Sequence, residues 1–328
     1  KQVDLHAVSD AVGQASDAVT EAYERRGARH LDTLLGAGRE AEPSSAHVPY
    51  IRRLSPLAGT YSKERAVDVC LGTLTELGFD LAADSRIKLD LEDRPQKNPR
   101  ACVIASRPPD VVHLITRAQG GLADYEAFLH EAGHALHYAG CDAALPYAFR
   151  RLARDHALTE IYAFLVESVT REPDWHVRHF GLDEDTAARN ADMAFVIETL
   201  LFRRYAAKLE SELRFWSDLG AAREHGPIYS DLVSAASGFR YPPSAYLADM
   251  DGGFYTADYL RAWIRAAQVR ASLREHVGAD WWCNSASGEF LRDLFREGTQ
   301  PSNEDVGARL GFGALDTQPL VSELAAEL

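Results

Sequence analysis

The chain has 328 residues, of which 46% are hydrophobic, so it is long enough to bury a large core. Its formal net charge of −14 argues against nucleic acid or an anionic membrane surface as a partner. There is no signal-peptide pattern and no apolar run of about 18 residues. The four cysteines are scattered without a Cys-x-x-Cys pair, which favours reduced thiols in a cytoplasmic protein.

The N-terminal part of the chain is predicted to be helical. Residues 3–35 have the apolar spacing of one or two amphipathic helices, and the Glu-Pro-Ser-Ser run at 42–45 predicts a loop. We therefore expect an N-terminal helical segment over residues 1–45 and a main domain over residues 46–328. A further helix is predicted over 62–77, where a serine can cap the first turn and a glycine follows the last.

The only strand-like stretches lie between residues 84 and 118. Residues 87–91 alternate between apolar and polar side chains, and residues 101–105 and 111–115 are rich in β-branched side chains. Prolines separate these stretches. The pattern predicts a small sheet.

The helix predicted over 122–139 contains the most informative motif, His130-Glu131-Ala132-Gly133-His134. Residues four apart lie on one face of a helix, roughly 6 Å from each other. His130 and His134 can therefore point at one metal ion, with Glu131 beside it as an acceptor for a proton from water. The His-Glu-x-x-His pattern predicts a zinc hydrolase.

A catalytic zinc site needs a third protein ligand, and no later His follows the motif at a suitable spacing. The next strongly apolar helix, predicted within 145–171, contains Glu160 and, two turns later, Glu167. A buried carboxylate is costly unless it is paired or binds metal. We expect Glu160 to be the third ligand and Glu167 to accept a hydrogen bond from one of the metal-binding histidines. Asp155 and His156 are nearby alternatives.

The remainder of the chain is predicted to be helical. Arg203, Arg204 and Lys208 are expected on the solvated face of a long helix, and Trp281 and Trp282 in the core. The fold class is therefore mainly α, a helical zincin-type catalytic domain with a small β-sheet beside the active-site helix. The predicted helices beyond 171 cover residues 184–213, 228–236, 255–276 and 286–296.

The motif and its surroundings resemble the thimet oligopeptidase and oligoendopeptidase F family of zinc metallopeptidases. The resemblance starts from His-Glu-x-Gly-His-Ala-Leu-His at 130–137, followed by a helix with two Glu residues seven apart. Weaker collinear similarities cover residues 61–66, 100–105, 111–115 and 298–312. The resemblance implies peptidase activity on short peptides and a helical catalytic domain with two lobes around a cleft.

One segment both matches this family and departs from it. The family pattern is His-x-x-Gly-Gly-Tyr-x-x-x-Tyr-Tyr-x-Tyr-Leu-Trp, whose His and Tyr side chains are implied to bind substrate and stabilise the oxyanion. Residues 249–263 keep both glycines, including Gly253, and the final Trp, but several donors are replaced. Tyr255 and Tyr259 remain as catalytic phenol donors, and Arg261 is a candidate cation for substrate. The alternative is that these tyrosines only pack between helices.

The expected mechanism follows from these residues. One zinc ion per chain, bound by His130, His134 and Glu160, activates a water from which Glu131 takes a proton. A tyrosine donor stabilises the oxyanion.

Substrate is expected to bind in extended form. The strand that contains Ala101 and Val103 can pair with an extended peptide, and Gly253 and Arg261 are further candidates for substrate binding. The expected partner is a peptide substrate, with no nucleic acid and no membrane; the oligomeric state is left open.

Two other functions fit the sequence. A zinc carboxypeptidase on a related scaffold would need a cation for the free C-terminal carboxylate, and Arg261 or Arg240 are candidates. A metal-binding pseudo-peptidase used for interaction would explain the altered residues 249–261, although it would not need Glu131. Two His and one carboxylate suit zinc best but also bind Mn or Co.

Overall fold

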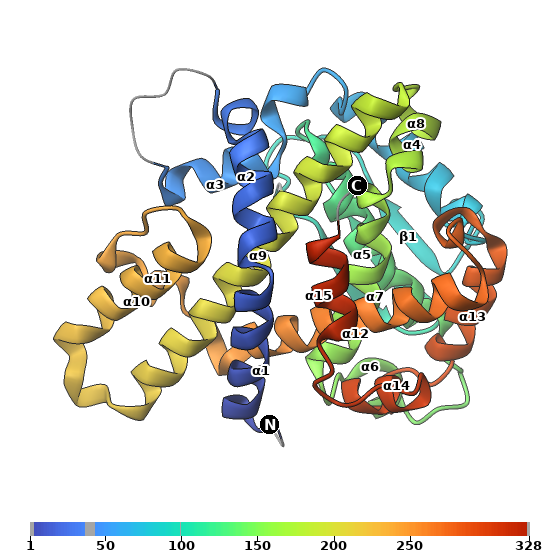
Figure 1. Cartoon of the computed structure of the whole chain (residues 1–328). Helices are drawn as coiled ribbons and strands as arrows, with labels where there is room; N and C mark the ends of the chain where they lie inside the picture. Colours follow the sequence, from blue (N-terminus) through green and yellow to red (C-terminus); the bar gives the residue numbers. More distant parts are fainter. Residues whose placement is uncertain (1–2, 37–42, 99, 327–328) are drawn as a thin grey trace.

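The computed structural model describes residues 3–36, 43–98 and 100–326 (Figure 1). Part of the predicted loop at 42–45 lies outside these residues. The first four helices are α1 (Leu5–Ala18), α2 (Thr20–Leu35), α3 (Val48–Arg52) and α4 (Lys63–Glu76). The strands are β1 (Ile87–Asp90), β2 (Cys102–Arg107) and β3 (Val111–Ile115). The later helices are α5 (Leu122–Gly140), α6 (Tyr147–Arg151), α7 (His156–Glu167), α8 (Pro173–Phe180), α9 (Glu184–Ser217), α10 (Ala222–Ser237), α11 (Tyr246–Asp249), α12 (Tyr255–His276), α13 (Ser285–Phe295), α14 (Asn303–Arg309) and α15 (Gln318–Ala325).

The three strands form one small sheet in the order β1-β3-β2. β1 runs parallel to β3, whereas β2 runs antiparallel to it, with Val103 opposite Leu114. Helix α5 packs against β2 and β3. The prediction of a mainly helical fold with a small sheet beside the motif helix is confirmed.

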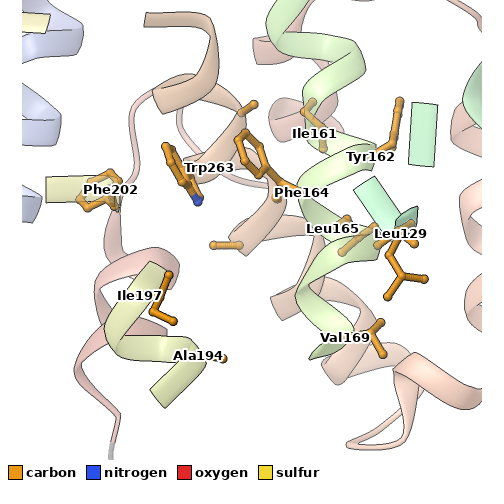
Figure 2. Close-up of a cluster of buried hydrophobic side chains, with 14 of the residues drawn as sticks. Leu129, Ile161, Tyr162, Phe164, Leu165, Val169, Ala194, Ile197, Phe202 and Trp263 are labelled. Carbon is orange, nitrogen blue, oxygen red and sulfur yellow. The ribbon is translucent and has the colours of Figure 1, made fainter. Parts of the chain in front are cut away.

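The helices continue outward from the sheet in layers. α5 packs on α7, α7 packs on α12, and the long helix α9 packs against α12 and against α1 and α2 (Figure 1). Figure 2 shows part of this core, where the rings of Phe164 and Trp263 lie side by side. Their centroids are 4.6 Å apart and their planes are nearly parallel, at 16°. Helices α1 and α2 share the same hydrophobic core, and the proposed boundary at residue 45 stays a prediction.

Gly133 allows α5 and α7 to cross closely. A Cβ at this position would overlap the Tyr162 carbonyl oxygen and would lie 2.7 Å from the Cα of Ala163. Only a residue without a side chain therefore fits here, although glycine is a poor helix former. This contact brings α7 close to the face of α5 that contains the motif.

The helix predicted over 145–171 is divided in the structure. Pro146 precedes α6, and Asp155 accepts a hydrogen bond from the backbone N–H of Ala157 at the start of α7. An N-cap of this kind favours a new helix at His156. The apolar periodicity predicted α7 correctly, but it did not predict the helix start capped by Asp155 within residues 145–171.

The prediction that Arg203, Arg204 and Lys208 lie on a solvated face is wrong. Arg203 and Lys208 are buried, with 6% and 3% of their surfaces exposed. Lys208 Nζ donates to Asp251 Oδ2 at 2.7 Å, and Arg204 pairs with Asp249. The partners are some 40 residues further along the chain, so helical periodicity gave no signal for them. Trp281 and Trp282 are buried, as predicted.

The close crossing predicts the effect of adding one methyl group. Gly133→Ala should lower the free energy of unfolding by about 1–3 kcal/mol, because the added Cβ forces α5 and α7 apart. Chemical denaturation measures this change. The matched control is Gly27→Ala in α2, where a Cβ meets no atom within 4 Å. That variant should be neutral or stabilised by up to about 1 kcal/mol. An unchanged or increased stability in Gly133→Ala would show that the two helices do not depend on this contact.

Candidate metal centre

The two motif histidines lie on one face of α5. The ring centroids of His130 and His134 are 5.0 Å apart. Both side chains are mostly buried, with 20% and 13% of their surfaces exposed. Phe164 of α7 packs against His130 edge to face, with a centroid distance of 5.5 Å. Packing thus holds the His130 ring in place before any ion binds, with the His134 ring edge-on beside it.

Helix α7 brings Glu160 to the same point. Its Oε2 atom lies 3.3 Å from His130 Nε2 and 3.5 Å from His134 Nε2. The Glu160 side chain is only 5% exposed. Burial alone would raise its pKa, but the neighbouring histidines outweigh burial and lower the pKa, so the carboxyl group is ionised.

These three residues fit a zinc ion. Glu160 Oε2 is buried and makes no hydrogen bond with any described residue, a costly state for a carboxylate oxygen without a cation. In a tetrahedral zinc site with bonds of about 2.0–2.1 Å, ligand atoms lie about 3.3–3.4 Å apart. Both distances to Glu160 Oε2 are close to this value. Among the described residues, His130, His134 and Glu160 are the cluster whose ligand atoms approach one another closely enough to hold a metal.

Glu167 orients one of the histidines. Its Oε2 atom lies 2.8 Å from His130 Nδ1, two turns after Glu160 on α7. A carboxylate that accepts the Nδ1–H of a histidine leaves the Nε2 lone pair free for a metal. This is the geometry expected for Glu167 from its spacing.

A cavity of about 620 Å³ opens in front of the site. His130, Glu131 and Tyr259 all line it. Burial raises the pKa of Glu131, and the neighbouring histidines oppose this effect. A carboxylate with a raised pKa is a better proton acceptor than an exposed one. The placement of Glu131 therefore suits a general base.

The two predicted tyrosine donors occupy different places. Tyr259 lines the cavity, and burial raises its pKa, so its phenol stays protonated and can donate. Tyr255 is not among the described residues that line the cavity. Its hydroxyl donates to Glu160 Oε1 at 2.7 Å. Tyr259 therefore has the position of an oxyanion donor, whereas Tyr255 faces a candidate metal ligand.

Arg261 does not have the geometry of a substrate-binding cation. Its side chain is 1% exposed and donates to both oxygens of Asp155, at 2.9 and 2.7 Å, and to Glu304. Asp155 in turn is occupied by this pair and by its N-cap contact, which removes it as an alternative ligand. Gly253 is exposed and is not among the described cavity residues. Arg240, the other predicted cation, is exposed and is also not among them.

The predicted substrate strand lies at the edge of the sheet. Among the described strands, β2 is paired with β3 on one side only, so its other edge is open to pairing. Ala101, just before β2, lines the cavity, and Val103 within β2 packs toward the core. The backbone of this strand, rather than the Val103 side chain, is placed to meet an extended ligand.

Sequence reasoning missed several charged residues in the cavity wall. Glu126 lies one helical turn before His130, and its pKa is raised to about 7 by burial and then by Glu167. Its four-residue spacing from His130 was a usable signal. Arg171 and Glu198, paired at 2.8 Å, also line the cavity, but they come from different elements and only the fold brings them together.

Comparison of the sequence with family models and with curated proteins gave no match. Solved structures are similar in fold. The chain superposes on BsuCP with a TM-score of 0.68 at 14% identity, over 99% of this chain and 66% of that one. It superposes on the M32 carboxypeptidase from Deinococcus radiodurans R1 with a TM-score of 0.62 at 18% identity, over 98% and 80%.

A protein from Bacillus anthracis str. Ames that was assigned as an oligoendopeptidase F gives a TM-score of 0.64 at 15% identity, over 99% of this chain and 55% of that one. The chain thus spans about two thirds of BsuCP and about half of the oligoendopeptidase F-like protein. The names of these neighbours describe two kinds of peptidase, a carboxypeptidase and an oligoendopeptidase F. At these identities the likeness establishes a shared fold.

Two further predictions concerned the cysteines and membrane-spanning segments. The four cysteines all lie in described segments, and each is a free thiol. Within the described residues, every helix falls short of the length and apolar character needed to cross a bilayer.

The geometry predicts how zinc content responds to loss of one ligand. The protein should bind about one zinc per chain, and Glu160→Ala should release most of it, because two histidines alone hold zinc weakly. Elemental analysis after gel filtration measures the content. Glu210→Ala, at a half-buried position on α9 where the side chain pairs with Arg214, is the matched control and should keep its zinc. Full zinc occupancy in Glu160→Ala would remove Glu160 as a ligand.

Proposed function

We propose that this protein is a zinc-dependent peptidase that hydrolyses peptide bonds in short peptides. The observation that carries the proposal is the meeting of His130, His134 and Glu160 at one point, with Glu131 beside them on the wall of a 620 Å³ cavity. A binding site for metal alone has no need of an acidic side chain in the position of Glu131. The shared fold with metallopeptidases supports the same conclusion.

Each residue of the site has a distinct part in this reaction. Bound zinc would polarise water and the scissile carbonyl. Glu131 accepts a proton from the attacking water and later passes it to the leaving amine, which its buried position and raised pKa favour. Glu167 holds the His130 ring in the orientation that exposes Nε2. Tyr259 donates its phenol hydrogen to the oxygen on which negative charge develops.

The cavity is large enough for a few residues of peptide. An extended substrate would add a strand at the open edge of β2 near Ala101, where main-chain hydrogen bonds fix its direction. Phe164, Leu201 and Trp263 give part of the wall an apolar surface for substrate side chains. Binding through the peptide backbone favours a broad range of sequences.

A carboxypeptidase is the second candidate, and one observation favours it. Arg52 and Arg100 both line the cavity, and neither has an ion pair with another described residue. Such a guanidinium group can bind a free C-terminal carboxylate. Arg261 and Arg240, the two cations predicted from sequence for this function, are not among the described residues that line the cavity.

A pair of matched peptides separates the two activities. The proposed oligopeptidase should cleave a peptide with an amidated C-terminus about as fast as the same peptide with a free C-terminus, because it needs no terminal charge. Mass spectrometry of the products gives both rates and the cleavage position. Loss of cleavage on amidation, with release of single C-terminal residues from the free peptide, would assign carboxypeptidase activity instead.

The role of Glu131 as the base has a direct test. Glu131→Gln should keep zinc and fold but lose peptide hydrolysis by about 10²–10⁴-fold, because the amide keeps the shape of the side chain and cannot accept the proton. The turnover of a fluorogenic peptide and the zinc content of the same sample measure the two effects. Parent-like turnover in the zinc-loaded variant would show that the proposed mechanism is wrong.

A further inference from the structure

Tyr255 makes the two oxygens of Glu160 unequal. Its hydroxyl donates to Oε1 at 2.7 Å, while Oε2 faces the two histidine Nε2 atoms and has no hydrogen-bond partner among the described residues. A carboxylate held at one oxygen cannot rotate freely about its terminal bond. Only Oε2 is then presented to a cation.

The ring of Tyr255 is held by neighbouring aromatic side chains. Tyr255 is not among the described cavity residues; its ring packs against His156, with centroids 5.4 Å apart, and against Tyr259 at 4.8 Å. In the Gly-Gly-Tyr pattern that residues 249–263 resemble, position 255 is not one of the tyrosines. The contact with Glu160 thus comes from a residue outside that pattern.

The backbone before Tyr255 needs support from elsewhere. Gly253 and Phe254 both adopt left-handed conformations, with φ of 65° and 56°. A left-handed conformation costs a non-glycine residue on the order of 1–2 kcal/mol. Contacts that hold this turn in place would therefore also favour the start of α12 at Tyr255.

Several contacts to this segment come from one face of α9. Arg204, Lys208 and Glu212 follow one another at four-residue intervals and face the segment 249–256. We call this set the α9–loop contact; its partners in the segment are Asp249, Asp251 and Thr256.

The contacts in this set are short and mostly buried. Lys208 Nζ donates to Asp251 Oδ2 at 2.7 Å, and Thr256 Oγ1 donates to the same oxygen at 2.9 Å. Glu212 Oε1 accepts from the Asp251 backbone N–H at 3.0 Å. Lys208 and Glu212 are each 3% exposed, and such buried charges are tolerated only with partners. The first turn of α12, and with it Tyr255, is therefore fixed to α9.

We propose that Tyr255 is a positioning residue that fixes the Glu160 carboxylate for metal binding, and that the α9–loop contact keeps Tyr255 in place. This inference deepens the proposed function and rests on it through the metal site. It also reassigns Tyr255 from the oxyanion role expected from sequence, which leaves that role to Tyr259.

Zinc affinity of the metal-free protein tests the hydroxyl directly. Tyr255→Phe keeps the ring and its packing but removes the bond to Glu160. Its dissociation constant for zinc, measured by competition with a chelating indicator, should rise about 10–100-fold. Its melting temperature without metal should stay close to that of the parent. If Tyr255 had only a structural role, weaker zinc binding would come with a lower melting temperature. An unchanged zinc affinity would overturn the proposal.

Tyr259→Phe is the matched control. Tyr259 lies one turn further along α12 and its ring packs against the ring of Tyr255, but no hydrogen bond joins it to Glu160. This variant should bind zinc like the parent and lose turnover by about 10²–10³-fold if its phenol stabilises the oxyanion. An equal loss of zinc affinity in both variants would show that general disturbance of α12, not the Tyr255 hydroxyl, is responsible.

A double-mutant cycle tests the α9–loop contact. Asp251→Asn removes the charge that Lys208 pairs with and should weaken zinc binding in the same direction as Tyr255→Phe. Because both changes act through one contact on Glu160, the double variant should lose less affinity than the sum of the single losses. Fully additive losses, or no loss in Asp251→Asn, would overturn the part assigned to α9.

The outcomes distinguish this inference from the proposed function. If the parent protein binds no zinc, the metal site fails and the inference fails with it. If the parent binds zinc and Tyr255→Phe binds it equally well, only the inference is wrong. If Tyr255→Phe binds zinc weakly while no peptide is cleaved by the parent, the positioning role stands and the peptidase proposal is wrong.

Discussion

The close crossing of α5 and α7 at Gly133 is the contact on which the site depends. The three candidate ligands come from two helices, and Glu160 reaches the histidines only because the backbones of those helices almost touch. A Cβ at position 133 would overlap the Tyr162 carbonyl oxygen, so the helices would have to move apart and Glu160 Oε2 would move away from the two histidine nitrogens. The glycine weakens the helix locally, and the close packing offsets this cost.

Around this contact the protein concentrates acidic groups that need compensation. Glu126, Glu131, Glu160, Glu167 and Glu198 all lie in or beside the cavity wall. Arg171 neutralises Glu198, and the motif histidines lie against Glu160 and Glu167. Part of the negative charge remains without a protein partner at the point where the ligand atoms meet. A divalent cation there would supply the missing charge, so the electrostatics and the ligand distances lead to the same site.

Local patterns in the sequence predicted the centre of the site, and tertiary contacts decided its surroundings. The His130–His134 pair and Glu160 could be read from the chain because helical spacing alone puts them on defined faces. Most helices were predicted from the same spacing, and the strands from alternating and β-branched side chains. Arg261 was misjudged because its partners, Asp155 and Glu304, lie 106 and 43 residues away along the chain. Lys208 was misjudged because a charged residue on a helix gives no sign of a distant buried carboxylate. The hydrogen bond from Tyr255 to Glu160 could not be predicted from local sequence patterns either, because the two residues lie 95 residues apart in the chain.

Anomalous X-ray diffraction at the zinc absorption edge, from crystals grown with zinc, tests the central claim most directly. The account predicts one strong peak per chain, about 2.0–2.2 Å from His130 Nε2, His134 Nε2 and Glu160 Oε2, with the Tyr255 hydroxyl still on the other oxygen of Glu160. A peak bound by other residues, or no peak at the motif in crystals that contain zinc elsewhere, would contradict it.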